Sequence, residues 1–289
     1  MAERPPSPLI DVDELAVRLR RGDVRVADTR WKLGDPGFGR TIFEEGHIPS
    51  ATHLDMDRDL AAPPGAGGRH PLPRPDAFAR TMSQAGIGNT LVVAYDQGDG
   101  LGAGRLWWLL RHFGYPNVVV LDGGFQAWRD ADQPIEQGPP RQVPAVPFTA
   151  RPNDHDAIEA DELRLALSTG SVHLLDARAP ERWRGDIEPV DGVPGRIPGA
   201  INVPAASQIN RGKFRTPAEL LASFEGLGVL DGKPIVVSCG SGVSACVDLI
   251  GLELAGVKDA KLYPGSYSGW IEKGFPVEHG EPFAEEEEG

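Results

Sequence analysis

An internal repeat runs through most of this sequence, because four short blocks of similar residues occur in the same order in both halves. The blocks begin at Val24, Gly46, Leu91 and Leu121 in the first half and at Val172, Gly195, Ile235 and Tyr263 in the second. Matched blocks in a fixed order are typical of a duplicated structural unit. The 289 residues are also about twice a usual domain length of roughly 150, so we expect two similar domains.

A proline-rich segment, residues 134–152, separates the two halves. It has neither helical nor strand periodicity, as is typical of a semi-rigid linker. We therefore expect a first domain over residues 1–133 and a second over residues 153–283. The four glutamates before the final glycine predict a solvated acidic tail over residues 284–289.

Short apolar runs alternate with helical patterns in each half. Runs such as residues 91–96 and 235–239 are β-branched and bounded by Gly, Pro or Asp, as buried strands of a parallel sheet are. Asp11 and Glu14 predict the capped start of a helix, and Gly22 predicts its end. Alternating strands and helices indicate an α/β fold in both domains.

Charge and hydropathy exclude several classes of partner. The formal net charge of −13 argues against nucleic-acid binding, because phosphate contacts need clustered Lys and Arg. No apolar run approaches the roughly 20 residues of a membrane-spanning helix. The amino terminus lacks the charged and apolar regions of a secretion signal. We expect a cytoplasmic protein with no membrane or nucleic-acid partner.

The only cysteines are Cys239 and Cys246, too few for a four-cysteine zinc site. If both lay on one helix, seven residues would separate them by about 10 Å, which is beyond the reach of a disulfide. We expect two free thiols and no metal. Cys246 falls among the apolar positions of a helix and is expected to pack in the core.

The position of Cys239 favours a reactive thiol. It lies between an apolar strand and a helix, at the strand end where open α/β sheets bind ligands. Gly240 and Gly242 allow backbone N–H groups to point toward one centre, and the helix dipole favours an anion there. The same field favours the thiolate, which is the nucleophilic form. The alternative is an inert, buried core cysteine.

A cysteine phosphatase uses a similar strand, loop and helix. That chemistry needs an arginine six residues after the cysteine, where this chain has Ala245. Phosphatase activity is therefore not expected.

Residues 239–245, with the sequence Cys-Gly-Ser-Gly-Val-Ser-Ala, resemble the active loop of the tandem rhodanese family, and most closely that of its 3-mercaptopyruvate sulfurtransferase branch. The resemblance extends over roughly residues 11–283. It implies two rhodanese-like domains, each a parallel sheet flanked by helices. Because Asp96 stands at the counterpart of Cys239, it also implies that only the second domain is catalytic.

The resemblance implies that Cys239 takes sulfur from a donor as a persulfide and needs no cofactor. The acceptor would be cyanide or a thiol such as thioredoxin. Family members that prefer thiosulfate usually carry cations in the loop, whereas Gly240, Ser241 and Ser244 are neutral, so 3-mercaptopyruvate is the expected donor. A thiosulfate:cyanide sulfurtransferase and a non-catalytic persulfide carrier remain the alternatives.

Arg182 is implied to clamp the donor carboxylate, a task suited to a forked guanidinium. Its alternative role is a surface ion pair. Where many family members have a second arginine, this chain has Val190, and Arg196 is expected to supply positive charge instead.

The family also implies a proton-handling group made of a loop serine with a histidine and an aspartate of the first domain. Ser241 and His47 match these positions, and Asp35 is a loose candidate for the aspartate. A purely structural role for His47 is the alternative. The donor site is expected to be completed by Gly240, Gly242, Val243 and Ser244.

Overall fold

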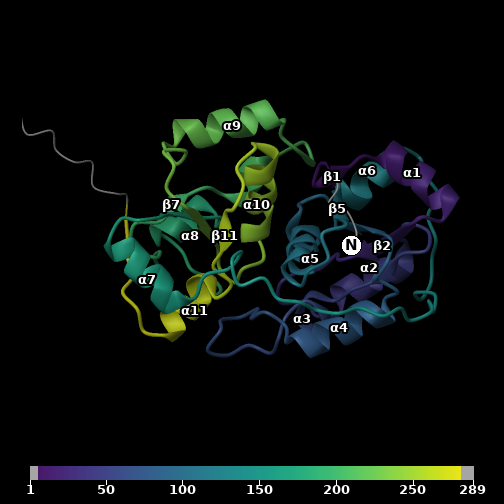
Figure 1. Cartoon of the computed structure of the whole chain (residues 1–289), viewed down its shortest axis with the longest axis horizontal. Helices are drawn as coiled ribbons and strands as arrows, with labels where there is room; N and C mark the ends of the chain where they lie inside the picture. Colours follow the sequence, from purple (N-terminus) through teal and green to yellow (C-terminus); the bar gives the residue numbers. More distant parts are fainter. Residues whose placement is uncertain (1–5, 281–289) are drawn as a thin grey trace, which may run out of the picture.

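The computed structural model describes residues 6–280. The acidic tail expected over residues 284–289 lies outside the described residues, as does the predicted end of the second domain at residue 283. Figure 1 shows two α/β domains side by side, the first in purple to teal and the second in teal to yellow. The predicted fold class is confirmed.

The first domain has eleven helices and strands among the described residues. They are β1 (Leu9–Ile10), α1 (Val12–Arg21), β2 (Val24–Asp28), α2 (Phe38–Glu45), β3 (Thr52–His53), α3 (Met56–Asp59), α4 (Pro75–Gln84), β4 (Leu91–Tyr95), α5 (Leu101–His112), β5 (Val118–Leu121) and α6 (Gly124–Asp130). Its five strands form one parallel sheet in the order β1-β5-β4-β2-β3.

The second domain repeats this arrangement with a shorter sheet. Its elements are α7 (Ala160–Ser168), β6 (His173–Asp176), α8 (Pro180–Arg184), β7 (Ile201–Asn202), the 3₁₀ helix η1 (Ala205–Gln208), β8 (Ile209–Asn210), β9 (Lys213–Phe214), α9 (Pro217–Gly226), β10 (Ile235–Ser238), α10 (Ala245–Leu254), β11 (Lys261–Leu262) and α11 (Ser266–Glu272). Four strands form a parallel sheet in the order β11-β10-β6-β7, and β8 and β9 form a small hairpin.

No described helix or strand lies between α6 and α7, a stretch that contains the linker predicted over residues 134–152. The domain boundaries drawn from the sequence remain predictions.

Equivalent contacts confirm that the two halves share one framework. The indole of Trp128 donates to the carbonyl of Pro134 at 2.8 Å, and that of Trp270 donates to Pro276 at 2.8 Å. In both domains an aspartate at the end of a central strand pairs with an arginine two residues later. The repeated blocks of the sequence are therefore largely structural.

The sheets have apolar side chains on both faces, as expected for parallel strands covered by helices. One cluster of buried residues packs the outer face of the first sheet and another packs that of the second. A third and larger cluster is continuous between the domains and includes α5 and α10. The interface between the domains is thus part of the hydrophobic core.

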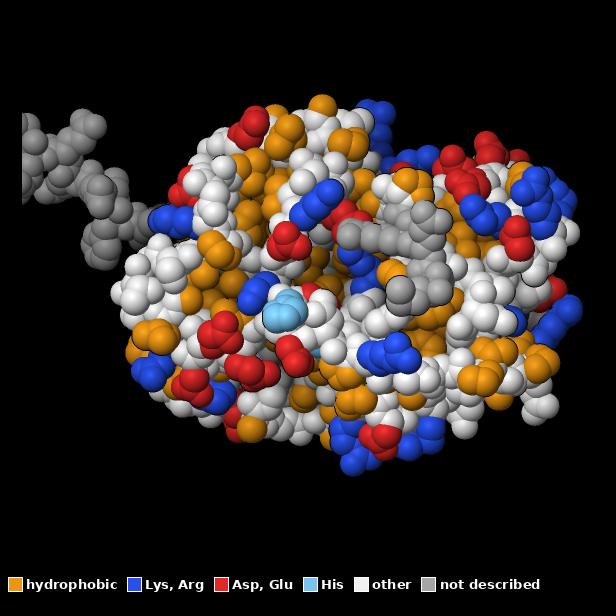
Figure 2. Space-filling view, in the orientation of Figure 1, with side chains coloured by type: hydrophobic (Ala, Val, Ile, Leu, Met, Phe, Trp, Pro, Cys, Tyr) orange, Lys and Arg blue, Asp and Glu red, His pale blue; other side chains and the backbone are white. Residues whose placement is uncertain are grey.

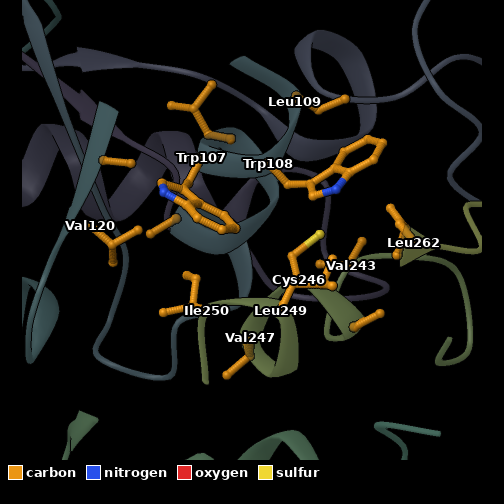
Figure 3. Packing of buried hydrophobic residues seen from close by; sticks show 14 of the residues in the cluster. Trp107, Trp108, Leu109, Val120, Val243, Cys246, Val247, Leu249, Ile250 and Leu262 are labelled. Carbon is orange, nitrogen blue, oxygen red and sulfur yellow. The ribbon is translucent and has the colours of Figure 1, made fainter. Parts of the chain in front are cut away.

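The cluster between the domains contains both tryptophans of α5 (Figure 3). Trp107 and Trp108 face residues of α10 and the preceding loop, and the Cys246 side chain points from α10 toward them. Cys246 is fully buried. The apolar spacing along α10 therefore serves contact with the other domain.

Local capping signals set the helix ends. Asp11 accepts a hydrogen bond from the amide of Glu14 at 2.8 Å, and Gly22 ends α1 in the left-handed conformation. Helix α10 begins at Ala245, two residues later than the apolar spacing starts, because Val243 still belongs to the loop. The glycine-rich loop is thus longer than the sequence pattern shows.

Acidic and basic side chains are interspersed on the face seen in Figure 2. Within residues 6–280, no helix combines the length and apolar composition needed to cross a bilayer.

Candidate active site

Cys239 is the first residue after β10 and lies in the loop before α10. Its side chain is buried, and its Sγ accepts a hydrogen bond from the backbone N–H of Gly242 at 3.1 Å. The Ser266 hydroxyl lies 3.9 Å from the same sulfur and accepts the N–H of Cys239 at 3.0 Å. Donors that point at the sulfur stabilise negative charge on it.

The rest of the loop supplies further donors. Four of its backbone amides form no hydrogen bond with any described residue, namely those of Gly240, Ser241, Val243 and Ser244. Gly242 has φ +77°, a left-handed conformation that glycine adopts without strain. A side chain at position 242 would also lie 2.6 Å from the carbonyl oxygen of Pro264, so the turn needs glycine.

The other side of the loop is contacted by a histidine of the first domain. His70 Nδ1 lies 2.7 Å from Ser241 Oγ, and His70 Nε2 lies 2.9 Å from Asp57 Oδ1. The Asp57 carboxylate only accepts hydrogen bonds, so we assign the ring proton to Nε2 and leave Nδ1 to accept the Ser241 hydroxyl. The pair of domains thus forms an Asp57–His70–Ser241 relay.

His70 is held in its neutral form. Burial lowers the pKa of its imidazole, and the charges of Arg105 and Arg69 lower it further, whereas Asp57 opposes both effects. A neutral imidazole at neutral pH can take up a proton and return it, which is what a general acid–base group needs.

These positions correct the prediction for His47, which lies away from the loop. Its Nδ1 faces the carbonyl of Phe43 at 2.8 Å, and its ring stacks on the Phe43 ring with centroids 3.8 Å apart. Its backbone N–H donates to Glu136 at 2.8 Å. Asp35 is exposed in the loop before α2, and Asp57 takes the place expected for it.

Arg196 also has a structural role, which corrects the expectation that it adds charge to the donor site. Its guanidinium pairs with Glu278, donates to the carbonyl of Gly280, and stacks over the Trp183 ring at 4.1 Å. Its backbone pairs with Glu278 as the backbone of His47 pairs with Glu136. His47 and Arg196 align in the repeat because each binds the segment near the end of its own domain through a backbone pair.

Arg182 lies beside the loop, as the sequence predicts, but two acidic side chains hold it. It donates to both Glu188 oxygens, at 2.7 and 3.0 Å, and to Asp191 at 3.0 Å. Arg69 of the first domain pairs with the same Asp191 at 2.6 Å. Both arginine side chains are partly exposed, whereas the two carboxylates are almost fully buried.

Arg105 of α5 lies behind the loop and is completely buried. Its guanidinium donates to the carbonyls of Gly242 at 3.1 Å and His70 at 3.0 Å, and contacts that of Leu60 at 3.3 Å. One cation of the first domain therefore positions both the cysteine loop and the segment that carries His70.

The first domain shows what such a loop can hold. The Asp96 carboxylate, at the counterpart of Cys239, accepts the amides of Gly98 at 2.9 Å, Gly100 at 3.2 Å and Ala103 at 3.0 Å. The Asp96 carbonyl accepts the amide of Phe125 at 2.8 Å, as that of Cys239 accepts the amide of Tyr267 at 2.9 Å. In the first domain the loop after this strand thus directs three amides at an acidic side chain, and in the second it directs the Gly242 amide at the Cys239 sulfur.

Among residues 6–280, no three His, Cys, Asp or Glu side chains are placed to hold a metal ion. The groups around Cys239 are hydrogen-bond donors, the Asp57–His70–Ser241 relay and two arginines. This set suits the binding of a small anion next to a nucleophilic sulfur.

Comparison with known proteins agrees with this geometry. The family model for the rhodanese-like domain matches residues 11–131 and 159–273. The chain belongs to the rhodanese family. It is a tandem rhodanese, because the two matches correspond to the two domains of the fold.

Full-length relatives of this tandem rhodanese are named as sulfurtransferases. It is 41% identical to a "Probable 3-mercaptopyruvate sulfurtransferase" of Pseudomonas aeruginosa, over 91% of this chain and 94% of that protein. It is 42% identical to a "Putative thiosulfate sulfurtransferase SseB" of Mycobacterium tuberculosis, over 91% and 93%. The crystal structure of SseA from Escherichia coli, a 3-mercaptopyruvate sulfotransferase, matches with a TM-score of 0.81 and 33% identity, over 91% and 99%.

Sequence reasoning missed His70, Asp57, Arg69 and Arg105. His70 and Arg69 lie in the segment between α3 and α4, outside the four repeated blocks. Their position outside the repeated blocks is the sequence signal by which these residues could have been identified. Residues repeated in both halves support the shared fold, whereas the side chains that contact the Cys239 loop come from parts of the first domain that the repeat does not match.

Proposed function

We propose that this protein transfers sulfur from 3-mercaptopyruvate to cyanide or to a thiol, through a persulfide on Cys239. One observation supports this most directly: the Asp57–His70–Ser241 relay ends in the loop whose Gly242 amide donates to the Cys239 sulfur. A nucleophile and a proton-transfer group therefore meet at the carboxyl end of β10, as catalysis by covalent intermediates requires.

The first half-reaction conserves charge and protons. The Cys239 thiolate attacks the donor sulfur and forms the S–S bond, while the C–S bond of the donor breaks and leaves its electron pair on carbon. The product is the enolate of pyruvate. The proton of the donor thiol moves to that carbon, which yields pyruvate and an anionic persulfide.

We assign the proton transfer to the relay. Ser241 donates to His70 Nδ1, so a proton from the donor thiol can pass through the hydroxyl to the neutral imidazole and return to the enolate carbon. The four loop amides that have no partner within residues 6–280 are available to the terminal sulfur of the persulfide.

The acceptor must come from outside the protein. Cys246 is the only other cysteine; it is buried, and burial raises the pKa of its thiol to about 12, so it cannot act as a resolving thiolate. An external thiol such as thioredoxin, or cyanide, would attack the outer sulfur and regenerate Cys239. We propose that this takes place in the cytoplasm.

Thiosulfate is the second candidate donor, because a relative at 42% identity is named for it. The loop itself carries no cation, which favours the monocarboxylate donor. Steady-state assays with each donor and cyanide should give the higher kcat/KM for 3-mercaptopyruvate, and a higher value for thiosulfate would reject the donor assignment.

Mass spectrometry tests the persulfide directly. Protein incubated with 3-mercaptopyruvate should gain one sulfur that maps to Cys239, C239S should gain none, and C246S should behave as the wild type. If sulfur adds only from a partner protein and neither small donor turns over, the protein is a carrier rather than this enzyme.

A further inference from the structure

Three charged side chains converge over the residue that follows the nucleophile. A Cβ built on Gly240 would lie 2.5 Å from Arg69 Nη2, 3.5 Å from Asp191 Oδ2 and 3.6 Å from Arg182 Nη1. Arg69 comes from the first domain, and the other two come from the second. These three residues, here called the charged bridge, therefore lie over the catalytic loop where a donor must enter.

Asp191 is the shared partner in this bridge. Its Oδ1 accepts Arg69 Nε at 2.6 Å, and its Oδ2 accepts Arg69 Nη2 at 3.2 Å and Arg182 Nη2 at 3.0 Å. Its side chain is 1% exposed, against 24% for Arg69. The carboxylate is thus bound by the fork of Arg69 and by a single contact from Arg182, an arrangement that a donor carboxylate could take over.

The two arginines differ in what else they bind. Arg182 would keep both oxygens of Glu188 if Asp191 moved away. Arg69 has no acidic partner other than Asp191 among the described residues. Release of Asp191 would thus leave Arg69, rather than Arg182, in need of a counter-ion.

Arg69 is fixed relative to the loop by its own backbone. Its N–H donates to Ser268 Oγ at 3.1 Å, and the neighbouring Gly68 packs so closely on the second domain that a Cβ there would lie 2.7 Å from the Gly265 carbonyl. The next residue, His70, contacts Ser241. Arg69 therefore stays at the site when its partner changes.

Asp191 lies in an irregular segment, because no helix or strand is present between α8 and β7. Its neighbours along the chain, Val190 and Val193, are exposed, so the segment is held mainly by polar contacts. The amides of Val190 and Asp191 donate to Glu188 at 2.9 Å, and Tyr267 donates to the carbonyl of Val193 at 3.0 Å. The Asp191 carboxylate can therefore leave the two arginines without disruption of the hydrophobic core.

We propose that Arg69 is the second guanidinium of the donor site and that Asp191 occupies its place until the donor carboxylate displaces it. This inference rests on the proposed sulfurtransfer from 3-mercaptopyruvate. It assigns to the first domain a residue that sets donor specificity, and it accounts for Val190 where a second arginine is usual. Exchange of one carboxylate for another leaves the net charge of the site unchanged, so the site favours a monocarboxylate.

The test compares 3-mercaptopyruvate with 1-mercapto-2-propanone, in which a methyl group replaces the carboxylate. In R69Q, kcat/KM for mercaptopyruvate should fall by about 30-fold, mostly through KM, because a charge-assisted bidentate contact is lost. The value for the uncharged donor should change by less than about threefold. R69K should recover part of the loss, and D191N should lower KM for mercaptopyruvate because an amide competes less well for Arg69.

The control is R74Q, which removes an exposed arginine from the same region of the first domain and should leave both donors unaffected. Equal losses on both donors in R69Q, an unchanged KM in R69Q, or a raised KM in D191N would each overturn the inference. If the wild type does not use the uncharged donor, the inference is tested by KM for 3-mercaptopyruvate in R69Q, R69K and D191N alone. Failure of wild-type Cys239 to gain sulfur would instead reject the proposed function.

Discussion

His70 is a buried imidazole whose two nitrogens face different partners. Asp57 fixes the proton on Nε2, and this leaves Nδ1 to accept the Ser241 hydroxyl. The side chain of Asp57 is 47% exposed, so the outer end of the relay is in contact with solvent. The orientation of the relay, and not only its presence, therefore depends on a carboxylate at position 57.

D57N should reduce kcat/KM by about 100-fold, because an amide that donates to Nε2 would move the ring proton to Nδ1 and reverse the relay. The pH profile should also change. Only neutral His70 is active, so the rate falls as pH decreases through its pKa, which lies below the ordinary value of 6.5. Asp57 raises that pKa, so D57N should move the acid limb to lower pH.

The matched control is D76N, which neutralises an exposed aspartate of α4 in the same domain. It should change neither the rate nor the profile. An acid limb at the same pH in D57N and in the wild type would show that His70 is not the titrating group.

Among the secondary-structure elements, α10 is unusual because it contains a buried carboxyl group. Asp248 lies in its first turn, is completely buried, and has no hydrogen-bond partner for either oxygen among the described residues. Burial raises the pKa of this carboxyl well above its usual range, and negative charge on Cys239 and Asp176 adds to the effect. Burial therefore favours the neutral carboxyl in the folded protein, whereas unfolding exposes it to water and lets it ionise.

D248N should stabilise the protein at neutral pH. The folded state binds a proton that the unfolded state loses above its pKa of about 3.9, so the wild type becomes less stable as pH rises above that value. The asparagine variant lacks this loss, and its free energy of unfolding should exceed that of the wild type at pH 7 by up to about 4 kcal/mol, which corresponds to roughly three pH units at about 1.4 kcal/mol each. At pH 4 the two should be nearly equal.

Urea unfolding between pH 4 and pH 8 measures this difference. D161N, in which an exposed carboxylate of α7 is neutralised, should follow the wild-type pH dependence. Parallel curves for D248N and the wild type would mean that Asp248 is ionised in the fold.

In the whole molecule, the geometry of the candidate site depends on the contact between the domains. Helices α5 and α10 pack against each other in a continuous core (Figures 1 and 3). Arg105 crosses this contact to the Gly242 carbonyl while it also holds the carbonyl of His70. The domain without a nucleophile is thus required for the geometry of the active site.

R105M should lower the free energy of unfolding by about 3 kcal/mol, because several buried carbonyls lose their donor. It should also lower kcat, since the cysteine loop and the His70 segment lose a common anchor. Denaturant unfolding and single-turnover persulfide formation measure the two effects.

R111M provides the control, because Arg111 also joins α5 to α10, through Glu253 at 2.7 Å, but in a partly exposed pair. Its loss should cost no more than about 1 kcal/mol and should leave kcat unchanged. Equal effects of the two substitutions would show that Arg105 acts only as a structural tether.

Features that depend on local order along the chain could be predicted from the amino-acid sequence alone. The two-domain α/β fold follows from the repeated blocks, and α1 begins and ends where Asp11 and Gly22 predict. The nucleophilic loop is also local, because Cys239, Gly240 and Gly242 are neighbours, and strand, turn and helix follow one another directly. Such features depend on interactions a few residues apart, which patterns in a sequence record.

The distant side chains that contact this loop, in contrast, could be identified only from the way the two domains pack together. His70 and Ser241 are 171 positions apart, and Arg69 and Asp191 are 122 apart, so no spacing rule relates them. Alignment of the repeat pointed to His47 and Arg196 instead. These residues occupy equivalent positions in the duplicated fold, and each forms a backbone pair near the end of its own domain. Contact between unlike segments of the two domains arises when their apolar faces pack together, and that packing brings the relay and the charged bridge to Cys239.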